Sequence, residues 1–79
     1  MKPQMVLEKL QEIISFYTDE PLEIKLDAHV FRDLTINSFD YTNIITDIED
    51  EFQITIDDLS IFRIKDLVQL IIDLKGKQE

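Results

Sequence analysis

Residues 38–52, SFDYTNIITDIEDEF, decide the fold because their apolar side chains recur at the spacing of a helix. The apolar positions follow one another at intervals of three, one, three and four residues: Tyr41, Ile44, Ile45, Ile48 and Phe52. That spacing places all five on one face of an α-helix. Asn37 and Ser38 are both good N-cap residues, so we expect this helix to cover about residues 38–52.

Helices are also predicted on both sides of this stretch. Pro3 suits a first helical turn, and apolar residues then recur at helical spacing over about residues 3–17, before turn-forming residues at 18–21. The last helix is predicted over about residues 65–75, with Gly76 ending it. Asp57 is a suitable cap for one short helix over about residues 57–61.

The long connection between the first two helices has a different pattern. Leu22, Ile24 and Leu26 alternate with charged residues, as in a strand, but a single strand has nothing to pair with. We therefore expect an extended loop that its apolar side chains, with Val30, Phe31 and Leu34, fix to the helices. A loop of this length is expected to let the first two helices run roughly parallel. The sequence thus predicts one all-α domain over residues 1–79, a four-helix bundle of three main helices and one short helix.

The charge of the chain limits the classes of partner that it is expected to bind. Seventeen acidic residues against eight basic ones give a net charge of −9. No Lys or Arg lies between Arg32 and Arg63, where eight acidic residues fall. This distribution disfavours nucleic acids and anionic membranes as partners and favours basic protein surfaces, although a charged run by itself is most often a solvated face.

The rest of the composition excludes several kinds of site. The chain has no cysteine and one histidine, His29, so we expect no disulfide, no thiol nucleophile and no metal site. No apolar run is long enough for a signal peptide or a membrane span. We expect a cytoplasmic monomer. Because His29 has no nucleophile as a partner, we expect no enzymatic activity.

Ser38 is the candidate for chemistry. Ser15 and Ser60 fall inside predicted helices, whereas Ser38 lies at a helix N-terminus. Free N–H groups and the helix dipole favour a phosphate at such an end. Position alone, however, more often indicates a plain N-cap.

A wider pattern surrounds this serine. Its elements, in order, are Phe31, Asp33-Leu34, Ser38-Phe39-Asp40, Glu49-Asp50-Glu51-Phe52, Ile56 and IKDLVQLI at residues 64–71. This ordered pattern resembles the acyl carrier protein family, over about residues 26–74. The resemblance implies an acyl-carrier-like four-helix bundle in which Ser38 is the attachment site of 4′-phosphopantetheine. A separate phosphopantetheinyl transferase donates this group from coenzyme A, and its thiol carries acyl groups as thioesters.

The resemblance also implies partners and their contacts. Phe39 is the apolar contact beside the arm, and Asp40, Glu49 and Asp50 match positions that dock onto basic surfaces. The implied partners are the transferase and acyl-loading, ketosynthase-type or adenylating enzymes of fatty-acid, polyketide or related specialised biosynthesis. Such docking is transient and salt-sensitive.

Five positions depart from the family pattern. Thr35 stands where glycine is usual, Asn37 where aspartate is usual, and Phe39 where leucine is usual. Asn43 and Thr46 are neutral and polar where an acid and an apolar contact are common. These departures favour a dedicated carrier in a specialised pathway. Two alternatives stay open: an aminoacyl or peptidyl carrier of a nonribosomal pathway, whose Gly-Gly-x-Ser signature is missing at residues 35–38, and an unmodified acidic four-helix interaction module in which Ser38 is only a cap.

Overall fold

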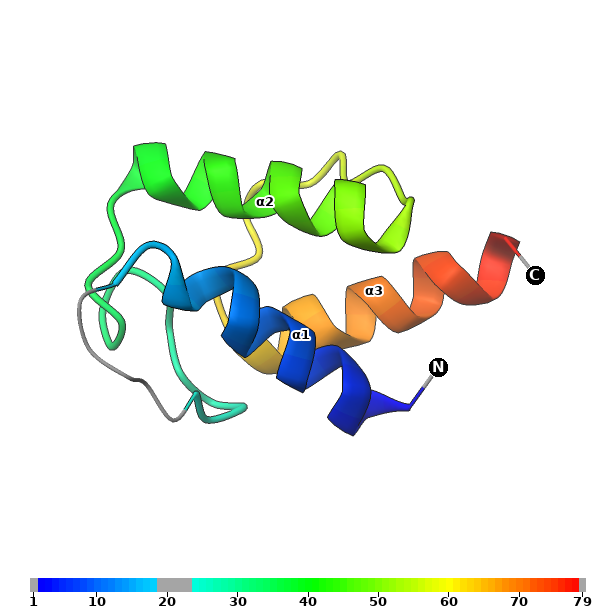
Figure 1. The fold of residues 1–79 in the computed structure, drawn as a ribbon, viewed down its shortest axis with the longest axis horizontal. Helices are drawn as coiled ribbons and strands as arrows, with labels where there is room; N and C mark the ends of the chain where they lie inside the picture. The colour runs from blue at the N-terminus through cyan, green and yellow to red at the C-terminus, as the bar shows by residue number, and fades with distance from the viewer. Residues whose placement is uncertain (1, 19–23, 79) are drawn as a thin grey trace.

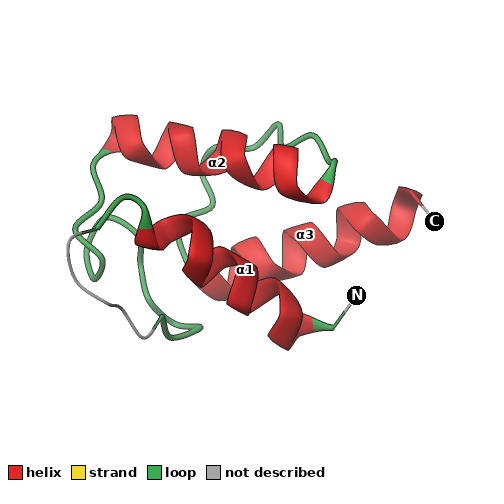
Figure 2. Ribbon diagram, viewed as in Figure 1, coloured by secondary structure: helices red, strands yellow, loops and turns green. Residues whose placement is uncertain are grey.

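Three helices form the protein in the computed structural model, which describes residues 2–18 and 24–78 (Figures 1 and 2). They are α1 (Pro3–Ser15), α2 (Ser38–Phe52) and α3 (Ile64–Gln78). No strand occurs among the described residues, where His29 and Arg63 form an isolated antiparallel bridge. The all-α class is therefore confirmed. The bounds of α2 agree with the prediction, and α1 ends two residues early.

The short helix predicted at residues 57–61 is wrong, because these residues have no regular secondary structure. The Asp58 carboxylate instead accepts hydrogen bonds from the backbone N–H of Ser60, at 2.8 Å, and from its hydroxyl, at 2.5 Å. These bonds lower the pKa of Asp58. Local side-chain bonds of this kind compete with helical hydrogen bonding.

The predicted end of the last helix at Gly76 is also wrong, since α3 continues to Gln78. Gly76 does not have the positive φ of a left-handed cap. A glycine inside a helix costs about 1 kcal/mol relative to alanine, which does not by itself end the helix. Lys75 and Lys77 lie in the last turn, where positive charge interacts favourably with the helix dipole.

The first two helices run antiparallel, so the prediction of a roughly parallel pair is wrong. Tyr17, just beyond α1, bonds to Asp47, whereas Lys9, earlier in α1, contacts Glu51, later in α2. The long loop explains this arrangement. It returns the chain to the end of the molecule where α1 finished, opposite both termini, and α2 starts there (Figure 1).

The loop is fixed by buried side chains and by backbone pairing. Its described part buries Ile24, Ala28, Val30, Leu34 and Ile36, which confirms the prediction for Ile24, Val30 and Leu34. Leu26 is exposed, so the prediction that it fixes the loop is wrong, and Leu22 and residues 19–21 lie outside the described residues. The backbone N–H of Val30 donates to the Phe62 carbonyl at 2.8 Å, and that of Lys65 donates to the Leu26 carbonyl at 2.7 Å. The loop is thereby joined to the chain that leads into α3.

One core joins the three helices and this loop. All five residues of the predicted α2 stripe are buried, and they meet buried apolar residues from the other two helices: Val6, Leu10, Ile13, Ile14, Ile64, Leu67, Val68 and Ile71. No polar side chain is buried among the described residues. Within the same part of the chain, each helix is too short or too polar to cross a membrane.

Candidate functional site

Asn37, and not Ser38, caps α2. The Asn37 side-chain oxygen accepts a hydrogen bond from the backbone N–H of Asp40 at 2.8 Å, and Ser38 is the first residue of the helix. The Ser38 side chain is exposed, and its hydroxyl bonds to no other residue in ranges 2–18 and 24–78. The interpretation of Ser38 as a plain N-cap is therefore wrong. Ser38 is an exposed residue whose hydroxyl has no hydrogen-bonding role among the residues that the structure describes.

The environment of this hydroxyl suits a phosphate ester. α2 is a helix of 15 residues, and its N-terminus carries partial positive charge and N–H groups that lack intrahelical acceptors. The Asn37 side chain satisfies the N–H of Asp40 and brings no charge of its own. A phosphodiester joined to the Ser38 oxygen at this end is favoured by the dipole. The residues present thus fit a phosphate-linked group.

Thr35 shapes the backbone that leads to Ser38. Its φ is 53°, in the left-handed region that β-branched residues rarely adopt. Threonine stands at this position, where the family pattern usually has glycine. The loop keeps the left-handed conformation with a threonine in it. For an L-residue other than glycine, this costs about 1–2 kcal/mol.

Replacing Thr35 with glycine is therefore expected to stabilise the protein by about 1 kcal/mol, because the strain removed exceeds the added entropy of the unfolded chain. Urea unfolding followed by circular dichroism measures this difference. Thr55→Gly is the matched control, since Thr55 is also an exposed loop residue and has no positive φ. The control should lose stability. A loss at both positions would contradict strain at Thr35.

An aromatic cluster anchors the first turn of α2. It contains His29, Phe31, Tyr41 and Phe62, and the ring centroids that meet lie between 5.1 Å and 6.0 Å apart. The Tyr41 hydroxyl donates to the Ile61 carbonyl at 2.6 Å, and burial raises the pKa of Tyr41. Tyr41 was predicted only as part of the helix stripe, and no pattern in the sequence indicated a contact with Phe62. Their meeting depends on the path of two loops.

His29 has a local structural role within this cluster. Its Nδ1 accepts hydrogen bonds from the backbone N–H groups of Phe31 and Arg32, both at 3.2 Å. Its own backbone N–H donates to the Asp33 carboxylate at 2.8 Å. These bonds close the turn at residues 29–34.

The four predicted docking residues do not share one face of α2: Phe39 and Asp50, 11 residues apart, lie on the same face, and Asp40 and Glu49 lie to either side of it. Phe39 is 75% exposed and directly follows Ser38. Asp50 is exposed on the side of α1, where it lines a hollow, and Asp40 is half-buried in the first turn. Glu49 is half-buried, and its carboxylate accepts a hydrogen bond from the Ile56 N–H at 2.8 Å, which holds the loop after α2. Phe39 and Asp40 directly follow Ser38 in the first turn of α2, whereas Glu49 has a structural contact that the sequence did not indicate.

A second contact that the sequence did not indicate joins α2 to Tyr17, just beyond the end of α1. The Tyr17 hydroxyl donates to the Asp47 carboxylate at 2.5 Å. This hydrogen bond, with burial and the Asp47 charge, raises the pKa of Tyr17 to about 12. Tyr17 therefore stays neutral, and able to donate, well above neutral pH.

Comparisons with known proteins agree with this geometry. Residues 6–73 match the family model described as phosphopantetheine attachment site. The chain is also 32% identical, over 80 aligned residues, to a curated protein of Cyanophora paradoxa named acyl carrier protein. That alignment covers 90% of this chain and 78% of the other.

Proposed function

Because this chain belongs to the acyl carrier protein family, whose phosphopantetheine-attachment domain carries a covalently bound 4′-phosphopantetheine, we propose that Ser38 is the residue that receives this group. Members of the family are carrier proteins and not enzymes. One observation supports Ser38 above all others. Its hydroxyl is exposed at the positive end of α2, while Asn37 provides the cap that a serine there would otherwise supply.

The proposed modification is a phosphoryl-group transfer catalysed by a partner enzyme. The Ser38 oxygen forms a bond to the phosphorus that carries pantetheine in coenzyme A. The pyrophosphate bond breaks, the adenosine bisphosphate leaves, and the serine loses its proton to a base of the transferase. The thiol at the far end of the arm then forms thioesters. The protein thus supplies an accessible nucleophile and a helix end that favours the phosphate.

We propose that Phe39 and Asp40 form the contact surface for the transferase and for the enzymes that load and use the acyl group. Phe39 offers an exposed apolar side chain beside Ser38, and Asp40 adds negative charge in the same turn. The net charge of −9 favours encounter with basic surfaces. The proposed setting is fatty-acid, polyketide or related specialised biosynthesis.

The test is intact-mass spectrometry after incubation with coenzyme A and a promiscuous phosphopantetheinyl transferase. The wild type and Ser15→Ala should each gain one phosphopantetheine, and Ser38→Ala should gain none. Ser15 is the matched control because its hydroxyl donates to the Glu12 carbonyl and is not needed for transfer. Failure of the wild type with several transferases would support an unmodified interaction module. A gain of one phosphopantetheine by Ser38→Ala would show that the group is attached to another residue.

A further inference from the structure

A groove between α1 and α2 lies apart from the Ser38 end. On the α1 side, Met5, Lys9, Glu12 and Phe16 line it, at intervals of four, three and four residues, which is the spacing of one helix face. Two hollows of about 410 Å³ each make up this α1–α2 groove. Phe39 lines neither hollow. The groove is therefore separate from the contact surface proposed at Phe39 and Asp40, although it contains Asp50, another of the four predicted docking residues.

Exposed apolar side chains lie at both ends of the α1–α2 groove. Met5 is 58% exposed and Phe16 is 80% exposed. They are 11 residues apart in the chain, which corresponds to about 16 Å at the rise of an α-helix. Buried Ile13 and Phe52 also line the two hollows. Single exposed apolar residues are common, but two that line one groove together with buried apolar side chains indicate a contact surface.

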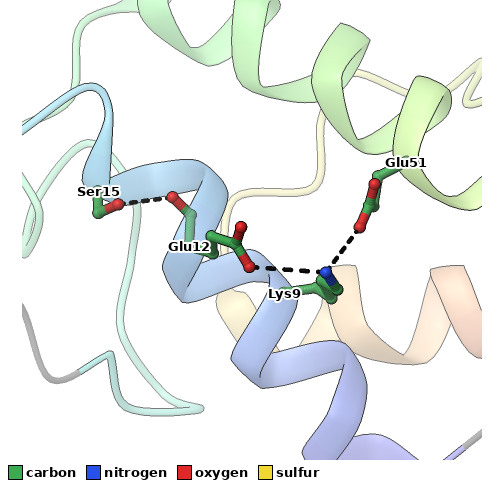
Figure 3. A network of polar contacts seen from close by, with 4 residues as sticks. All are labelled: Lys9, Glu12, Ser15 and Glu51. Carbon is green, nitrogen blue, oxygen red and sulfur yellow. Dashed lines mark hydrogen bonds and ion pairs between the residues drawn. The ribbon is translucent and has the colours of Figure 1, made fainter.

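Between these apolar ends the groove is acidic. Five carboxylates line it: Glu8, Glu12, Asp47, Asp50 and Glu51. Among the described residues that line it, Lys9 is the single cation, and its ammonium lies 3.0 Å from Glu51 and 3.6 Å from Glu12 (Figure 3). Glu51 and Glu12 raise the pKa of Lys9. Exposed ion pairs contribute little to stability, so a cation of a partner can replace Lys9 at small cost.

We propose that the α1–α2 groove binds a basic amphipathic helix of a partner protein, about three turns long. Its apolar residues would fill the two hollows beside Met5 and Phe16, and its Lys or Arg side chains would pair with the carboxylates between them. Docking of the apolar face of an amphipathic helix in a groove is a recurring mode of peptide recognition. A second copy of the chain is a poor occupant because both copies carry a charge of −9. The groove therefore offers a second docking surface, which a partner can use while another enzyme reaches Ser38.

The unmodified protein is suitable for the test, so its outcome does not depend on phosphopantetheine. The probe is a synthetic peptide of about 14 residues, two LKKLLKL repeats, which forms a basic amphipathic helix. Titration followed by ¹H–¹⁵N NMR should shift the amide signals of Lys9, Glu12, Phe16, Asp50 and Glu51 the most. Phe16→Ser should weaken binding about tenfold, whereas Phe39→Ser should leave it unchanged.

Two controls separate this site from general attraction between opposite charges. A peptide of equal charge with glycine in place of leucine should bind at least about tenfold more weakly, because it leaves the hollows unfilled. Circular dichroism of Phe16→Ser should match the wild type, since this side chain is exposed. Shifts centred on Phe39, equal binding of both peptides, or equal binding by Phe16→Ser would each overturn the proposal. Concentration-dependent dimerisation that Phe16→Ser abolishes would assign the groove to a second copy instead.

Discussion

Replacing Phe39 with serine is expected to lower the kcat/KM for loading of Ser38 by about 30-fold while leaving the fold intact. A large apolar side chain at the centre of an interface typically contributes 2 kcal/mol or more to binding, which corresponds to about that factor. Phe39 directly follows Ser38 and is 75% exposed, so its side chain is accessible to an enzyme that binds at the serine. Because it is absent from the buried core, its loss should change the free energy of unfolding by no more than about 0.5 kcal/mol.

Phe16→Ser is the matched control, since Phe16 is an equally large and even more exposed phenylalanine on another surface. Initial rates of phosphopantetheine transfer at several protein concentrations, with coenzyme A in excess, give kcat/KM for both variants. Only Phe39→Ser should load slowly. Normal loading of Phe39→Ser, or equal slowing of both variants, would show that the transferase does not contact the first turn of α2.

Local patterns were enough to predict α2. Its apolar stripe and its cap both lie within the helix or directly before it, so the helical period placed the start and end correctly. Which of two good caps is used was not determined, because Asn37 and Ser38 both suit the position. The structure decides between them, since the Asn37 side chain bonds to the Asp40 N–H and leaves Ser38 free.

The predictions were wrong where a local side-chain hydrogen bond, or a contact with a residue distant in the chain, outweighs the helical pattern. The predicted helix at residues 57–61 is replaced by the bonds of Asp58 to Ser60. Glu49 was predicted to be an acidic docking residue, yet its carboxylate accepts a hydrogen bond from the backbone N–H of Ile56, seven residues further along the chain. The antiparallel course of α1 and α2 depends on the returning loop, and helical periodicity carries no information on that path. The family pattern indicated Ser38 as a candidate, whereas the cap by Asn37 and the ring contacts of Tyr41 were found in the structure.

The aromatic cluster beside Ser38 gives the largest expected loss of stability. Tyr41→Ala is expected to lower the free energy of unfolding by about 3–5 kcal/mol, the range for truncation of a large buried aromatic residue. Tyr41 is buried, and its ring meets those of Phe31 and Phe62 at 5.3 Å and 5.7 Å. Small domains have a total stability of about 5–15 kcal/mol, so this variant should be close to unfolding.

Two further substitutions serve as comparisons for Tyr41→Ala. Tyr41→Phe keeps the ring contacts and removes only the hydrogen bond to the Ile61 carbonyl, so it should cost about 1 kcal/mol. Tyr17→Ala removes the other tyrosine, which is only half-buried and bonds to Asp47, and it should cost about 1–2 kcal/mol. The midpoint of urea unfolding, at an unchanged dependence of the free energy on urea concentration, measures the loss of stability in all three variants. Equal losses for Tyr41→Ala and Tyr41→Phe would assign the contribution to the hydroxyl. A larger loss for Tyr41→Ala would instead show that ring packing holds the turn carrying Ser38 against the loops, because Ser38 lies three residues before Tyr41 in the same helix.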